Sequence, residues 1–156
     1  MASAESVSGV APKTKFSSIC VFSGSSLGTD YEFVKAAIEL GKTFAARNIG
    51  LVFNGELSGL AGCVATHAMV GGSPVWSILL KNPQEKGMCS YSLGNEIKVS
   101  SAHERFMCMF GSAEAFIALP GGLEALEGIA NVVFWAKLNP QTLIKKPVGL
   151  LNINGF

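Results

Sequence analysis

Three apolar runs of this chain each end in a glycine-containing loop, and each loop leads into a segment with helical spacing. The runs are Ser18 to Phe22, Gly50 to Phe53 and Ala115 to Leu119. Buried parallel strands read as nearly continuous apolar runs, and strands that alternate with helices are typical of a sheet covered on both faces. The pattern predicts an α/β protein with a Rossmann-like, doubly wound parallel sheet in a three-layer α/β/α arrangement.

Other segments continue this expected alternation. A helix should begin at Tyr31, because Thr29 and Glu32 have the spacing of a capping box, and it should stop near Asn48. The remaining expected elements are strands at Pro74 to Leu80, Glu96 to Val99 and Pro147 to Leu151, helices at about Ser58 to Met69, Ser101 to Phe110 and Leu123 to Lys137, and a surface loop from Lys81 to Asn95.

Length and composition favour one domain without a polyanionic or membrane partner. The 156 residues, 49% of them hydrophobic, suffice for a single core. We expect residues 1–15, rich in Ala and Ser, to be a disordered leader and residues 16–156 to form the domain. A net charge of +1 without a basic block argues against a nucleic-acid partner. No apolar stretch approaches the roughly 20 residues of a membrane span, so we expect a protein of the cytosol, or of the cytosol and the nucleus.

The four cysteines show no pattern of a metal or disulfide site. Cys20, Cys63, Cys89 and Cys108 are scattered and form no CxxC pair. This spacing predicts buried reduced thiols, and neither disulfides nor a metal site is expected.

The three glycine loops form the first candidate site. They run from Ser23 to Gly28, Asn54 to Gly62 and Pro120 to Gly122, and in a parallel sheet they should emerge at one edge, beside the carboxyl ends of the strands. Free N–H groups and the positive end of the helix dipole after Gly122 would suit a phosphate. None of the loops has the Walker A or GxGxxG pattern, so a purely structural role for the last loop is the alternative.

Few ionisable side chains are candidates for chemistry. Arg105 lies near an expected helix start, where the dipole disfavours a cation, so a bound phosphate or carboxylate would explain it; a solvated arginine is the alternative. Glu127 lies in the first turns of its helix, where a carboxylate is favoured in any case. His67, among Ala and Met, is expected to pack rather than act as a base.

Five separated segments together resemble the plant LONELY GUY family, whose members are often labelled as lysine decarboxylases. The resemblance covers nearly the whole chain after residue 15. It implies a Rossmann-like homodimer that hydrolyses cytokinin riboside 5′-monophosphates to the cytokinin base and ribose 5-phosphate, with no cofactor. The segments are ICVFSGSS (19–26), LVFNGELSGLAG (51–62), HERF (103–106), AFIALPGG (115–122) and KPVGLLNINGF (146–156).

The resemblance also implies roles for individual residues. Loss of a purine base leaves an oxocarbenium-like sugar, which a carboxylate can stabilise. In the family the motif PGGxGTxxE supplies a phosphate loop and a catalytic glutamate, and an arginine of the preceding helix is the second catalytic residue. Arg105 matches that arginine, and Glu127, one place before the motif glutamate, is the candidate substitute. The substrate- and phosphate-binding residues expected on this basis are Ser25, Arg105, Gly121, Gly122, Leu123, Glu124, Ala125, Leu126 and Glu127.

The chain departs from the family motif at several positions. Glu124 and Ala125 stand where the family has glycine and threonine, and Gly128 stands where it has the catalytic glutamate. Phe106 occupies the position of a lysine. Because helical neighbours differ by about 100° around the axis, Glu127 does not automatically replace a carboxylate at position 128. Weak or lost turnover is therefore expected, and an inactive homologue that binds nucleotide or dimerises is the alternative.

The second loop and the chain end differ from the family as well. Phe53, Asn54, Gly55 and Glu56 stand where the family has a tyrosine and three glycines. Like-charge repulsion between a phosphate and the carboxylate of Glu56, or that of Glu124 just after the third loop, would be about 1–4 kcal/mol per contact at about 4 Å. Family members continue into a further helix, so a C-terminally short member is expected. A nucleotide-binding module for another base is a third possibility.

Overall fold

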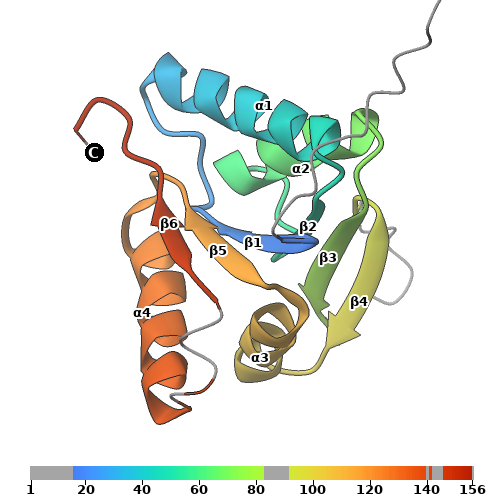
Figure 1. Ribbon diagram of the computed structural model, residues 1–156, viewed down its shortest axis with the longest axis vertical. Helices are drawn as coiled ribbons and strands as arrows, with labels where there is room; N and C mark the ends of the chain where they lie inside the picture. Colours follow the sequence, from blue (N-terminus) through green and yellow to red (C-terminus); the bar gives the residue numbers. More distant parts are fainter. Residues whose placement is uncertain (1–15, 83–91, 140, 142–145, 156) are drawn as a thin grey trace, which may run out of the picture.

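The computed structural model describes residues 16–82, 92–139, 141 and 146–155, and their strands form one parallel sheet with helices on both faces (Figure 1). The strand order is β4-β3-β2-β1-β5-β6, which confirms the predicted doubly wound α/β fold. The strands are β1 (Ser18–Phe22), β2 (Gly50–Phe53), β3 (Val75–Leu80), β4 (Asn95–Val99), β5 (Ala115–Ala118) and β6 (Val148–Leu150). Helices in this part of the chain are α1 (Tyr31–Ala46), α2 (Leu60–Val70), α3 (Ala102–Ser112) and α4 (Gly122–Leu138).

Alternate residues of the central strands enter two separate apolar cores. Val21 of β1 belongs to the core that includes Phe44 of α1 and residues of α2, whereas Cys20 belongs to the core with Met109 of α3 and Val132 of α4. Successive strand residues point to opposite faces, so a central strand must be apolar on both. This requirement explains why the central strands appear as continuous apolar runs in the sequence.

The strand order places the topological switch point between β1 and β5. From β1 the chain builds β2, β3 and β4 outward on one side, and α3 then carries it back to β5 on the other side of β1. Ligands of open α/β sheets bind beside the carboxyl ends of strands at such a point. Two of the glycine loops, those after β1 and β5, therefore flank the expected position of a site.

The start of α1 differs from the capping box expected for Thr29. Asp30 is the N-cap, and its Oδ1 accepts a hydrogen bond from the N–H of Glu32 at 2.9 Å. Aspartate caps a helix at least as well as threonine. The expected end is confirmed, because Asn48 adopts a positive φ of 51° just beyond the last helical turn.

Helix α2 begins later than the sequence pattern predicts, at Leu60 instead of about Ser58. The backbone of Leu57 crosses Gly62 so closely that a Cβ at position 62 would lie 2.5 Å from the carbonyl oxygen of Leu57. The segment before α2 must fold back across its first turn to make this contact, and it is therefore not helical.

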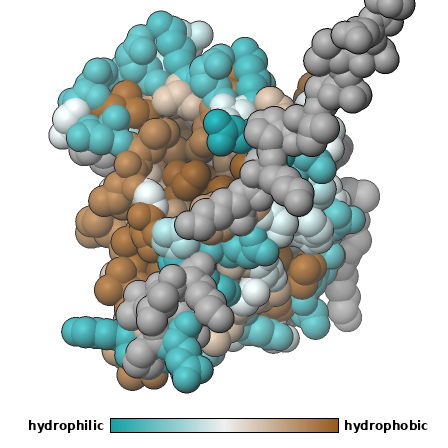
Figure 2. All heavy atoms as spheres, in the orientation of Figure 1, coloured by the Kyte–Doolittle hydropathy of each residue, from teal (hydrophilic) through white to brown (hydrophobic). Residues whose placement is uncertain are grey.

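One side of the molecule is unusually apolar. Figure 2 shows hydrophobic residues gathered over the region of α4 and β6. Large apolar side chains exposed on these two elements are Leu123, Leu126, Val133, Phe134, Leu138, Val148 and Leu150. None of the helices described here is long and apolar enough to cross a bilayer.

Some predictions fall wholly or partly outside the described residues. These are the disordered leader, most of the loop from Lys81 to Asn95, and Cys89. Of the other cysteines, Cys20 and Cys63 carry thiols whose pKa is raised by burial.

Candidate active site

The three glycine loops meet at the carboxyl edge of the sheet, as their positions after parallel strands predict. Gly24, in the loop after β1, touches the backbone of Gly121, and a Cβ at either position would overlap the other residue. A Cβ at Gly59, in the loop before α2, would overlap the carbonyl oxygen of Gly24. Ser23 ties two loops together, because its Oγ accepts a hydrogen bond from the N–H of Ala61 at 2.9 Å. The glycines are required here by close approach of three backbones.

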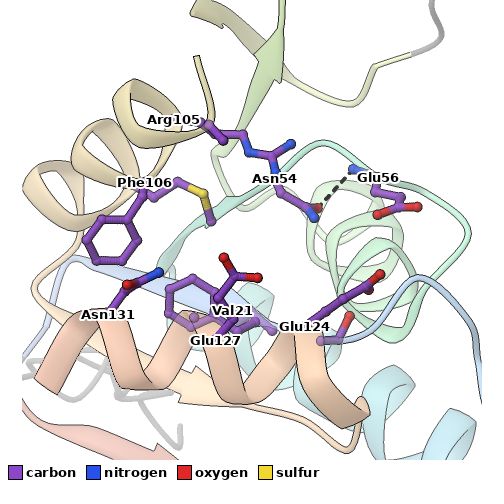
Figure 3. Close-up of a pocket in the computed structure, with 13 residues that line it drawn as sticks. Val21, Asn54, Glu56, Arg105, Phe106, Glu124, Glu127 and Asn131 are labelled. Atoms are coloured by element: carbon purple, nitrogen blue, oxygen red, sulfur yellow. Dashed lines mark hydrogen bonds between the residues drawn. The ribbon is translucent and has the colours of Figure 1, made fainter. Parts of the chain in front are cut away.

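A cavity of about 330 Å³ opens beside this junction, between α3 and α4. Figure 3 shows Arg105 reaching from α3 toward Asn54, while Glu124, Glu127 and Asn131 rise from α4 on the opposite side. The complete lining consists of Val21, Phe22, Ser23, Asn54, Glu56, Ala102, Arg105, Phe106, Met109, Glu124, Glu127, Gly128 and Asn131. The fold thus brings Arg105 and Glu127 into one cavity at the switch point.

Arg105 lies in the first turn of α3, as the sequence predicts, and is half-buried. Ser101 caps this helix by accepting a hydrogen bond from the N–H of Glu104 at 3.1 Å. Within the described residues, no carboxylate lies within ion-pair distance of the Arg105 guanidinium. A cation held at a helix start without an ionic partner is suited to receive an anionic or polar ligand.

Helix α4 lines the cavity with residues spaced along one face. Glu127 and Asn131 are four residues apart, so their side chains lie one above the other. Asn131 was not predicted from the sequence as a cavity residue, although its i+4 relation to Glu127 would have indicated it. Val21, Ala102 and Met109 were also missed as cavity residues, because apolar side chains in strand and helix patterns are expected to be core.

The space beside Gly128 is occupied by the side chain of Phe22, the last residue of β1. Gly128 is buried on α4, and a Cβ there would lie 2.6 Å from Cδ1 and 2.8 Å from Cγ of Phe22. Phe22 in turn stacks on Phe116, with ring centroids 6.0 Å apart. An aromatic ring therefore occupies the space next to the position where the family motif has its last glutamate.

A second, more open cavity of about 450 Å³ lies over the start of α4. It is lined by predicted phosphate-binding residues, namely Ser25, Gly121, Gly122, Leu123 and Glu124. Glu124 lines both cavities, and its Oε1 accepts a hydrogen bond from Oγ of Ser25 at 3.3 Å.

Two further residues predicted to bind phosphate line neither cavity. Ala125 lies on the buried face of α4, and Leu126 is exposed.

His67, expected to pack, lies on α2, where its Nδ1 is 2.9 Å from the carbonyl oxygen of Cys63. No group of three or more His, Cys, Asp or Glu side chains among the described residues could hold a metal ion.

Comparison with known proteins places the chain in a family. A family model described as "Possible lysine decarboxylase" matches residues 61–156. An Arabidopsis thaliana protein named cytokinin riboside 5′-monophosphate phosphoribohydrolase is 40% identical over 144 residues, which are 92% of this chain and 66% of that protein. A protein of Oryza sativa subsp. japonica, named as a probable enzyme of the same kind, is 38% identical over 155 residues, covering 99% of this chain and 67% of that protein. The chain thus spans about two thirds of the length of these curated relatives.

A solved structure supports the fold. The molybdenum cofactor binding protein of Rippkaea orientalis superimposes with a TM-score of 0.64 at 22% identity, covering 88% of this chain and 77% of that one. At this identity the likeness concerns the fold alone. The family model, which matches more than half of the chain, and the two plant relatives show that the chain belongs to the LONELY GUY family.

Proposed function

We propose that the cavity between α3 and α4 slowly hydrolyses the N-glycosidic bond of cytokinin riboside 5′-monophosphates, releasing the free base and ribose 5-phosphate. The plant relatives carry this activity in their names. The observation that carries the proposal is the convergence of Arg105 and Glu127, from two different helices, on one cavity at the switch point of the sheet.

The two charged side chains supply complementary parts of the reaction. As the bond between the anomeric carbon and the base nitrogen breaks, the electron pair leaves with the base and positive charge develops on the sugar. The water that adds to the anomeric carbon loses one proton, and the departing base gains one. The Glu127 carboxylate stabilises that charge or orients the water that adds to the anomeric carbon. The Arg105 guanidinium stabilises the leaving base or holds the phosphate.

The rest of the cavity suits a flat ring with polar edges. Phe106 and Met109 offer apolar and aromatic surface on the α3 side, and the amides of Asn54 and Asn131 offer donors and acceptors. Its volume of about 330 Å³ is within the usual range for small-molecule sites.

The assay is release of free base from isopentenyladenosine 5′-monophosphate by the full chain. Arg105→Ala should reduce the rate on the order of 10²-fold or more, because it removes a charged group that acts on the reacting nucleotide. Arg47→Ala is the matched control, since Arg47 is exposed at the end of α1 and lines neither cavity. Equal rates for the Arg105 variant and the unmodified chain would refute the proposed role.

An inactive homologue is the second candidate, and Gly128 is the observation that favours it. Glu127 lies one residue from the motif position, and the ring of Phe22 fills the space beside Gly128. A variant that combines Glu124→Gly, Ala125→Thr and Gly128→Glu tests this candidate. If that variant releases the base and the unmodified chain does not, the protein is an inactive homologue. Robust turnover by the unmodified chain would exclude it.

We further propose that the protein acts as a homodimer in the cytosol or nucleus. The exposed apolar side chains of α4 and β6 support an interface on that side, with Leu126 65% and Phe134 57% exposed. Stable interfaces bury about 800 Å² per partner, and a charge in the centre of an apolar one is costly. Size-exclusion chromatography should give a dimer that Phe134→Glu dissociates, and a monomer peak for the unmodified chain would refute the dimer.

A further inference from the structure

Glu124 occupies the junction between the two cavities. It is the third residue of α4, and it is exposed toward both spaces. Its carboxylate accepts the Ser25 hydroxyl at 3.3 Å, so it bridges the start of α4 and the loop after β1. A helix start favours one nearby anion, and in this chain the protein itself supplies that anion.

The charges around both cavities are unfavourable for a phosphate monoester. Glu56, Glu124 and Glu127 line the main cavity, and Arg105 is the only cationic side chain among the described residues lining either cavity. A phosphate monoester carries about −1.5 to −2 charges at pH 7. Its oxygens, placed over the start of α4, would lie beside the Glu124 carboxylate, and the two would repel each other.

The same carboxylates suit a sugar without a phosphate. A ribose carries hydroxyl groups that donate hydrogen bonds, and a carboxylate only accepts them. Glu124 and Glu127 lie three residues apart on α4 and share the main cavity, so both can receive sugar hydroxyls. The 5′-hydroxyl of a riboside would donate a hydrogen bond to the Glu124 carboxylate. A 5′-phosphate would be repelled by that carboxylate, because both groups are negatively charged.

We propose that Glu124 is a specificity-determining residue that disfavours the 5′-phosphate, so that this cavity accepts cytokinin ribosides in preference to their 5′-monophosphates. The inference rests on the proposed N-glycosidic chemistry and concerns only the group carried at the 5′ position. Arg105 and Glu127 keep the roles given above toward the leaving base and the developing positive charge on the sugar.

The test compares binding of isopentenyladenosine and of its 5′-monophosphate to the full chain by titration calorimetry. The riboside should bind about tenfold more tightly than the monophosphate, which corresponds to about 1.4 kcal/mol. Glu124→Gln keeps the size of the side chain and removes its charge, so it should strengthen monophosphate binding about tenfold and change riboside binding little. Glu39→Gln, on the exposed face of α1, is the matched control and should change neither affinity.

Salt provides a second readout. Screening weakens repulsion between exposed charges, so added salt should improve monophosphate binding to the unmodified chain. A cationic phosphate site would show the opposite trend. Tighter binding of the monophosphate, equal effects of Glu124→Gln on both ligands, or no binding of either ligand would each overturn the inference.

Free-base release from both ligands, measured in the same samples, separates this inference from the proposed function. Preferential riboside binding without base release from either ligand would uphold the specificity and refute the hydrolase. Preferential monophosphate binding with base release would uphold the hydrolase and refute the specificity.

Discussion

The packing of Phe22 of β1 against Gly128 of α4 predicts that substitutions at these two positions have coupled effects on the free energy of unfolding. In Gly128→Ala the added methyl group would lie 2.6 Å from Cδ1 of Phe22, so the ring must move. Overpacking of this kind costs about 1–3 kcal/mol. The same substitution gains about 1 kcal/mol in helix propensity. We therefore expect Gly128→Ala to lower the free energy of unfolding by about 0–2 kcal/mol.

Removing the ring should reverse the sign of this effect. In a Phe22→Ala background no ring atoms oppose the new methyl group, so Gly128→Ala should stabilise by up to about 1 kcal/mol. The coupling energy between the two sites is then about 1–3 kcal/mol. Urea denaturation followed by circular dichroism gives all four free energies, provided that the m-values agree.

A control variant isolates the propensity effect. Gly111, near the end of α3, has no atoms within 4 Å of the position of an added Cβ. Gly111→Ala should therefore stabilise with either residue at position 22. If Gly128→Ala had the same effect with and without the Phe22 ring, the contact between position 128 and that ring would be energetically irrelevant, and the predicted coupling would be refuted.

Three further predictions concern the scaffold. Asp30→Ala removes the cap of α1 and should lower the free energy of unfolding by about 0.5–2 kcal/mol, measured by thermal unfolding; an unchanged midpoint would refute the cap. Hydrogen bonds from the backbone N–H and Oγ of Ser17 lower the pKa of Glu114 below its usual 4.5, so its stabilising contribution is complete above that pH and disappears as the pH falls through the lower folded value. The stability difference between the unmodified chain and Glu114→Gln should therefore vanish in acid, and a difference that grows in acid would contradict the assignment. Cys20 is fully buried and the pKa of its thiol is raised by that burial, so a thiol reagent followed by mass spectrometry should label it only after unfolding; rapid labelling of the native chain would be inconsistent with this burial.

The sequence was sufficient to predict the features set by local pattern and topology. Apolar runs between helical segments predicted the central strands, and the rule for parallel sheets placed the glycine loops together. That rule also explains why Arg105, which follows β4, and Glu127, which follows β5, approach one edge. Local chemistry predicted Thr29 as the cap of α1, but Asp30 takes that position. Both residue types cap helices, so residue type alone does not identify the cap.

The contacts that modify the site depend on residues distant in sequence. The Phe22 ring reaches Gly128 only after α4 has packed across the sheet, and Ser25 meets Glu124 only because β1 and β5 are neighbours. A motif comparison shows that the residues at positions 124 and 128 differ from the family, but it does not show what each change contacts. Three-dimensional packing supplies that information.

The most direct test of the central claim is a double-mutant cycle on the rate of base release, expressed as kcat/KM. Arg105→Ala, Glu127→Gln and the double variant should each lose activity toward isopentenyladenosine 5′-monophosphate. Groups that act as a unit on one transition state are strongly non-additive, so the double variant should lose much less than the product of the two single losses. Full activity in either single variant, or losses that multiply, would contradict the claim that one cavity uses both residues on the same substrate.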